Sequence, residues 1–134
     1  MQILNIVLYV IVIAIILYFV GSWSYYAFIG RRMNGSISQE NFESTMRKAQ
    51  IVDLREKGQF DTKHILGARN LPYSQFKYVS GELRPDLPVY LYDERKNVCV
   101  RAAIKLQKQG FTDVKWLEDR FSNWEGKTKS NKKD

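Results

Sequence analysis

Hydrophobic and polar positions divide this chain into two regions of different character. The first 30 residues contain no Lys, Arg, Asp, Glu or His, and all 21 basic and 14 acidic residues follow from Arg31 onward. Within the first region, Ile3–Val20 is an apolar run interrupted only by Asn5. As a helix this run would cover about 27 Å, close to a hydrocarbon core of roughly 30 Å. The pattern predicts one transmembrane helix in residues 1–30.

The residues that follow the apolar run suit a membrane interface. An aromatic belt precedes Arg31 and Arg32 and comprises Tyr18, Trp23, Tyr25, Tyr26 and Phe28. A cleaved signal peptide is the alternative, but it would need basic residues before the run and small residues at a cleavage site, and Ser24–Ala27 is bulky. Because basic residues follow the run and none precede it, we expect the amino terminus outside and the rest of the chain in the cytoplasm.

From residue 36 onward, short apolar runs typical of buried strands alternate with stretches of helical periodicity. The expected strands are Gln50–Leu54, Ala68–Leu71, Val89–Tyr92 and Val114–Leu117. The expected helical segments are one capped by Ser38 and carrying Phe42, Met46 and Ala49, then Glu56–Lys63, Tyr73–Tyr78, Val98–Gln109 (ended by Gly110) and Phe121–Trp124. Alternating strands and helices predict a small α/β domain with a mainly parallel sheet and flanking helices.

These patterns divide the chain into four parts. A membrane helix with its interfacial segment occupies residues 1–30, a linker residues 31–35, and one compact domain residues 36–125. Residues 126–134 form a basic tail without an apolar side chain to bury, and we expect this tail to be disordered.

The net charge of +7 predicts an anionic partner. We expect the bilayer to hold residues 3–29, while anionic lipid headgroups contact Arg31, Arg32 and the lysines of the tail: Lys127, Lys129, Lys132 and Lys133. Nucleic acid is not expected, because no recognition motif is present and the aromatic residues lie in apolar runs. A single cysteine builds no disulfide framework, which fits a reducing compartment.

Asp93 is the first candidate functional residue, because it directly follows the strand Val89–Tyr92. A polar loop and the start of a helix come next, so the candidate site comprises Asp93, Glu94, Arg95, Lys96, Asn97, Val98 and Cys99. The N–H groups of such a loop and of the first helical turn converge on one point and can hold an anion.

Several motifs around this loop resemble those of the rhodanese family. The first runs through Asp53, Arg55, Phe60, His64, Ile65, Gly67, Ala68, Asn70 and Pro72. The carboxyl-terminal one comprises Gly110, Val114, Leu117, Phe121 and Trp124. Residues 36–125 carry the resemblance, and one anchor before one such domain is similar to the membrane-tethered rhodaneses of bacteria.

The resemblance implies a rhodanese-like fold and sulfur transfer, in which a cysteine after the fourth strand carries a sulfane sulfur as a persulfide. The matching position here is Asp93, and a carboxylate cannot form a persulfide. Asp119 and Arg120 stand in place of the family's paired glycines, and Lys63 in place of the glycine before His64. We therefore predict a module without thiosulfate sulfurtransferase activity that binds a protein or a small anionic ligand. The carboxylate of Asp93 would accept the loop N–H bonds itself.

Cys99 carries the alternative hypothesis, a sulfurtransferase that holds its persulfide six residues further on. The dipole at the start of the helix would favour a thiolate there, although a small semi-buried residue facing Ala102, Ala103 and Leu106 is the preferred interpretation. A phosphatase would need Arg six residues after Cys99, where Lys105 stands.

The remaining motif residues are interpreted as structural. Asp53, Arg55, His64, Gly67 and Asn70 are expected to order the segment Asp53–Pro72 by hydrogen bonding, and His64 to act there rather than as a general base. One His and one Cys are too few for a metal site, and no cofactor motif is found.

Overall fold

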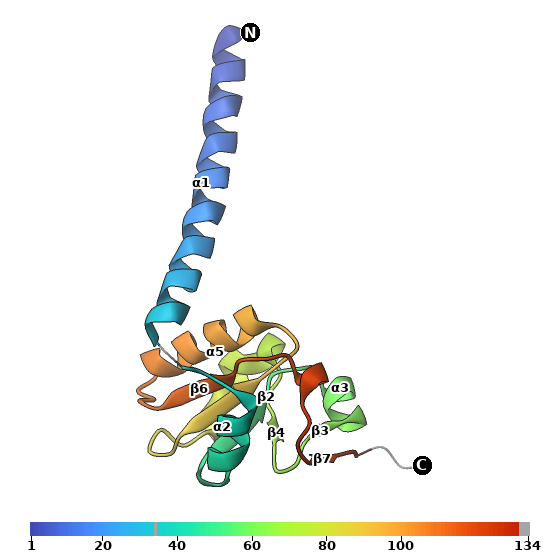
Figure 1. The fold of residues 1–134 in the computed structure, drawn as a ribbon. Coiled ribbons are helices and arrows are strands. Elements are labelled where there is room, and N and C mark those ends of the chain that lie inside the picture. Colours follow the sequence, from blue (N-terminus) through green and yellow to red (C-terminus); the bar gives the residue numbers. More distant parts are fainter. Residues whose placement is uncertain (34, 132–134) are drawn as a thin grey trace. The chain divides into compact units, whose positions relative to one another are not determined.

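The computed structural model describes residues 1–33 and 35–131, apart from the side chains of residues 27 and 29–33. The chain divides into two compact units, Met1–Asn34 and Gly35–Asp134. Figure 1 shows a single long helix in the first unit and an α/β sandwich in the second.

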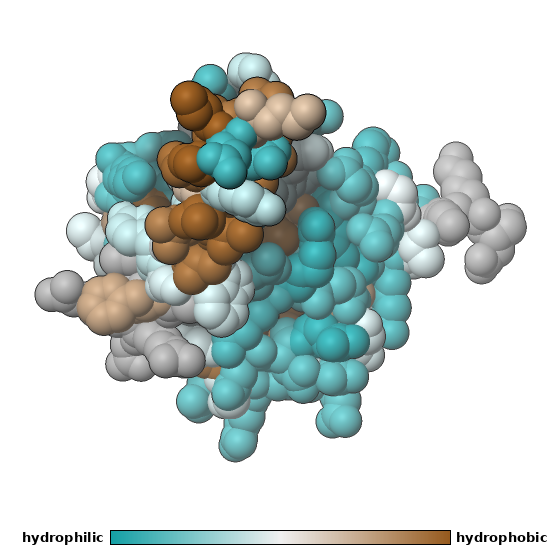
Figure 2. Space-filling view, turned by 90° about the horizontal axis from the view of Figure 1, so that it is seen from above, coloured by the Kyte–Doolittle hydropathy of each residue, from teal (hydrophilic) through white to brown (hydrophobic). Residues whose placement is uncertain are grey.

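The first unit is the helix α1, Gln2–Met33. Its stretch Gln2–Tyr26 is long and apolar enough to span a membrane, and its apolar side chains are exposed within the unit. In Figure 2 these residues appear brown, whereas the folded unit presents mainly teal, hydrophilic residues. The prediction that residues 31–35 form a linker outside the helix is wrong for residues 31–33, because α1 continues through them. Residue 34 lies outside the described residues.

The second unit contains a five-stranded sheet in which every pairing is parallel. Its strands are β1 (Ser36–Ile37), β2 (Gln50–Asp53), β4 (Arg69–Asn70), β5 (Val89–Tyr92) and β6 (Val114–Leu117), in the order β1-β6-β5-β2-β4. The prediction of an α/β domain with a mainly parallel sheet is confirmed.

Helices cover both faces of this sheet (Figure 1). The α-helices are α2 (Gln39–Thr45), α3 (Lys57–Thr62), α4 (Phe76–Val79) and α5 (Lys96–Lys108). The 3-10 turns are η1 (Met46–Lys48), η2 (Tyr73–Gln75), η3 (Ser80–Glu82) and η4 (Phe121–Asn123). The hydroxyl of Ser38 caps α2 by accepting the N–H of Asn41 at 3.3 Å. Gly110, with φ +99°, ends α5 because this backbone conformation is unfavourable for residues with a Cβ.

The core lies on both sides of β5, all of whose residues are buried. Tyr90 and Tyr92 point to the α2 face, where Phe42 packs against Tyr90 with ring centroids 5.1 Å apart. Side chains alternate along a strand, so Val89 and Leu91 face α5. Burial on both faces explains why this strand reads as a continuous apolar run.

A second, smaller sheet pairs β3 (His64–Ile65) with β7 (Thr128–Lys129) in antiparallel register. Asn131 attaches the following residues to α3, since its N–H donates to the carbonyl of Asp61 at 2.9 Å. The expectation of a disordered tail from residue 126 is therefore wrong up to residue 131. Backbone pairing orders these residues without requiring an apolar side chain.

Candidate functional site

Asp93 lies at the carboxyl end of β5, with only 4% of its surface exposed. The parallel register places Asp53 at the end of the neighbouring strand β2, opposite Tyr92. Two acidic side chains are thus buried at the edge of the sheet where α/β proteins usually bind ligands.

The carboxylate of Asp93 turns back onto its own loop. Its Oδ1 accepts the N–H of Arg95 at 2.9 Å and lies 3.6 Å from Arg95 Nε. Its Oδ2 is buried and has no hydrogen-bond partner among the described residues. Burial raises the pKa of Asp93, and the charge of Asp53 adds to this rise, while Arg95 opposes it.

The loop after Asp93 is shorter than the sequence suggested. Only Glu94 and Arg95 lie between Asp93 and α5, so Lys96–Cys99 forms the first turn of that helix. Glu94 accepts a hydrogen bond from the hydroxyl of Ser122, and the carbonyl of Asp93 accepts the N–H of Phe121 at 3.3 Å. The loop is therefore joined to η4 near the end of the chain.

Cys99 lies inside this site but is not accessible. Its side chain is 1% exposed on the inner face of α5, beside Ala102 and Ala103, which are fully buried. Burial raises the pKa of the Cys99 thiol, and the charges of Asp93 and Asp53 raise it further. Burial and these two charges outweigh the stabilisation of a thiolate that the helix dipole would give, so Cys99 is a buried thiol.

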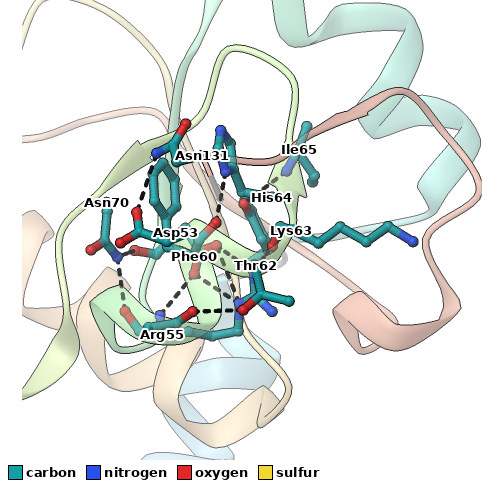
Figure 3. A network of polar contacts seen from close by, with 12 residues as sticks. Asp53, Arg55, Phe60, Thr62, Lys63, His64, Ile65, Asn70 and Asn131 are labelled. Carbon is teal, nitrogen blue, oxygen red and sulfur yellow. Dashed lines mark hydrogen bonds and ion pairs between the residues drawn. The ribbon is translucent and has the colours of Figure 1, made fainter. Parts of the chain in front are cut away.

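Asp53 and Arg55 form a buried ion pair (Figure 3). Arg55 Nη2 lies 2.7 Å from Asp53 Oδ2, and the backbone N–H of Arg55 donates to Asp53 Oδ1 at 2.8 Å. Arg55 Nη2 also donates to the carbonyl of Lys63 at 2.6 Å. Burial alone would lower the pKa of Arg55, but hydrogen bonding to Asp53 and its charge raise it.

Arg55 also connects the first motif to η4. Its guanidinium carbon lies 4.1 Å from the ring centroid of Phe121 and 5.8 Å from that of Tyr92. The hydroxyl of Tyr92 accepts the N–H of Ile65 at 3.1 Å, and burial raises the pKa of Tyr92. These contacts hold β2, β3, β5 and η4 together.

The other residues of the first motif lie in the turn that carries β3. His64 is 4% exposed, its Nδ1 lies 2.8 Å from the carbonyl oxygen of Phe60, and its ring stacks on Phe60 at 3.8 Å between centroids. Gly67 adopts φ +89°, and Asn70 Nδ2 donates to the carbonyls of Asp53 and Arg55 at 3.2 and 2.8 Å. All these contacts are made within the segment Asp53–Pro72.

Asp119 and Arg120 form an ordinary polar turn before η4. Asp119 Oδ1 accepts the N–H of Arg120 at 2.9 Å and the side-chain amide of Asn123 at 2.8 Å. Among the described residues no three His, Cys, Asp or Glu side chains gather as metal ligands would.

A cleft of about 860 Å³ was not predicted from the sequence. It lies between α2 and the η4 region, and four of its lining residues are acidic: Glu40, Glu43, Asp119 and Glu125. Residues so far apart in the chain give no joint signal in the sequence.

Comparisons of the sequence with known proteins identify the family of this chain. The sequence model of a family described as "Rhodanese-like domain" matches residues 38–127. The chain is 40% identical over 128 residues to the uncharacterized protein YqhL of Bacillus subtilis, covering 96% of this chain and 98% of that protein. It is 33% identical over 89 residues to the thiosulfate sulfurtransferase GlpE of Shewanella oneidensis, covering 66% and 88%.

Solved structures show the same fold. A rhodanese-related protein from Thermoplasma volcanium superimposes with a TM-score of 0.65 at 18% identity, covering 70% of this chain and 96% of that one.

Proposed function

We propose, from the premise that this chain belongs to the rhodanese-like domain family, that it is a membrane-anchored module without thiosulfate sulfurtransferase activity. In this proposal the domain has a binding or regulatory role, and its ligand is a protein or a small anion. One of its relatives is named a thiosulfate sulfurtransferase, which defines the activity that we propose is absent.

Asp93 is the observation that carries the proposal. It stands at the end of β5, where the family resemblance places the sulfur-carrying cysteine. Oδ1 of Asp93 already accepts the backbone N–H of Arg95 in the loop. In a persulfide enzyme such an N–H would donate to the anionic sulfur instead. A carboxyl group, whatever its protonation state, cannot form the S–S bond by which a cysteine carries the sulfane sulfur.

Cys99 does not provide a replacement nucleophile. Attack on a sulfane sulfur needs an accessible thiolate. Cys99 is 1% exposed, and its pKa is raised by burial and by two neighbouring carboxylates. A persulfide on Cys99 would also have to fit against Ala102 and Ala103 in the packed interior.

The apolar helix α1 supports the anchoring part of the proposal. Its stretch Gln2–Tyr26 suits a single span, and the basic residues that follow favour a cytoplasmic domain. Arg31, Arg32 and the lysines of the tail would then contact anionic headgroups.

A sulfurtransferase assay on the full chain in detergent tests the proposal. We expect no transfer of sulfur from thiosulfate to cyanide above the uncatalysed rate, both in the wild type and in Cys99→Ser. Asp93→Cys tests whether the loop still forms an anion site, and a gain of activity in this variant would show that only the nucleophile is missing. Turnover in the wild type that is lost in Cys99→Ser would overturn the proposal and support a persulfide carrier.

A further inference from the structure

The outer face of α5 is strongly basic. The helix contains four basic residues and no acidic one: Lys96, Arg101, Lys105 and Lys108. Arg101, Lys105 and Lys108 are spaced by four and three residues, so they follow one side of the helix. All three are exposed, while the opposite side of α5 packs into the core.

The segment from η2 to η3 lies beside α5 and adds Lys77 to the exposed surface there, together with one acidic residue, Glu82. Two contacts attach it: the ammonium of Lys105 lies 4.6 Å from the ring centroid of Tyr73, and the hydroxyl of Ser80 lies 3.4 Å from the side-chain amide of Gln109. Between these attachments α4 exposes Lys77, together with Tyr78, whose side chain is 81% exposed. We call Lys77, Tyr78, Arg101, Lys105 and Lys108 the basic face.

The opposite side of the sheet carries a cluster of acidic residues. α2 covers that side (Figure 1), and its Glu40 and Glu43 line the cleft together with Asp119 and Glu125. The net positive charge is therefore not spread evenly over the domain. A planar anionic surface would attract the basic side chains of α5 and repel this acidic cleft.

We propose that the basic face docks the domain onto the anionic headgroups of the bilayer in which α1 is anchored. The lysines and Arg101 supply the charge attraction, and Tyr78 is an amphipathic ring of the kind enriched at membrane interfaces. The acidic cleft and the loop at Asp93 are not part of this face. This inference rests on the membrane anchor of the proposed function.

A bilayer fits this face better than nucleic acid does. Only residue 34 separates the end of α1 at Met33 from the domain, which begins at Gly35. Because the anchor and the domain belong to one chain, docking onto the anchoring bilayer is intramolecular and loses less entropy than binding of a free domain would. Binding of nucleic acid through aromatic residues would need several stacking rings, whereas Tyr78 is the exposed aromatic residue of this face.

The test uses the full chain reconstituted in nanodiscs. A fluorophore is attached to Asn97→Cys, an exposed position of α5 four residues before Arg101 and therefore on the same side of the helix. Acrylamide quenching is compared in phosphatidylglycerol and in phosphatidylcholine nanodiscs. Cys99 remains unlabelled in the folded protein because it is buried. We expect protection of the label in the anionic discs only, and loss of that protection in 1 M salt, where the Debye length is about 3 Å.

Matched charge reversals locate the surface. Each basic residue near an anionic membrane strengthens binding roughly fivefold, so Lys105→Glu with Lys108→Glu should weaken docking by about 25-fold or more. Arg47→Glu with Lys48→Glu makes the same charge change at exposed residues of η1 and should leave the protection intact.

Each contrary result has its own meaning. A chain that does not enter nanodiscs contradicts the anchor of the proposed function. A chain that enters them but is quenched equally in both lipids overturns the docking proposal alone. Equal loss of protection in the two double variants would overturn the assignment to the basic face, and so would an oligonucleotide that displaces the label from anionic discs.

Discussion

Asp53 and Asp93 are buried at the ends of adjacent strands but are stabilised differently. Asp53 is fully buried and paired with Arg55, which donates to both of its carboxylate oxygens. Asp93 has one oxygen bonded to a backbone N–H and the other without a partner among the described residues. The first carboxylate therefore supports the fold, whereas the second carries an unfavourable buried oxygen.

Removal of Asp53 should destabilise the domain strongly. Asp53→Ala leaves the guanidinium of Arg55 buried without its carboxylate, which costs about 3–5 kcal/mol in the free energy of unfolding. The control is Asp86→Ala, which breaks the pair with Arg84 at the same N–O distance of 2.7 Å but on the surface. That change should cost about 0–1 kcal/mol in urea denaturation. Similar losses in the two variants would contradict the assigned role of Asp53.

Asp93 should make stability depend on pH. Because its folded pKa is raised above 3.8, its contribution is fully present below that value and is lost as pH rises through the folded pKa. The neutral variant Asp93→Asn lacks this loss. The free energy of unfolding of wild type minus that of Asp93→Asn should therefore fall as pH rises above about 4. A difference that increases with pH would show that Asp93 is stabilised as a carboxylate.

Elements with a pattern of their own followed from the sequence, whereas short strands without such a pattern did not. The strand Val114–Leu117 was predicted with its observed bounds, and Val98–Gln109 largely matches α5 because its periodicity extends over several turns. The two-residue strands β1, β3 and β7 were missed, since each depends on a partner more than 60 residues away. Asp93 could be chosen because a polar residue ended an apolar run, whereas the inaccessibility of Cys99 depends on tertiary packing.

The strand β7 should contribute measurably to stability. A chain that ends at Glu125 loses the pairing with β3 and the hydrogen bonds from Ser130 and Asn131 to Asp61. With each bond contributing about 0.5–1.5 kcal/mol, we expect a loss of about 2 kcal/mol in the free energy of unfolding. A chain that ends at Asn131 keeps these bonds and serves as the control. Equal stability of the two truncated chains would refute a stabilising role for β7.

The whole chain combines a helix that is long and apolar enough to span a membrane with a rhodanese-like domain. Its proposed location can be tested directly. We expect the full chain to stay in the membrane fraction after an alkaline carbonate wash, while a chain lacking residues 1–34 becomes soluble. In intact spheroplasts, external protease should leave the domain uncleaved, as expected for a cytoplasmic domain. Cleavage from outside would reverse the proposed orientation, and extraction by carbonate would contradict the anchor.

The absence of sulfur transfer is the central claim, and intact-mass spectrometry after incubation with thiosulfate tests it most directly. We predict that the wild-type chain keeps its unmodified mass, because Asp93 cannot hold sulfur and Cys99 is a buried thiol. A chain that gains the mass of one sulfur atom, removable by cyanide and absent in Cys99→Ser, would contradict the account.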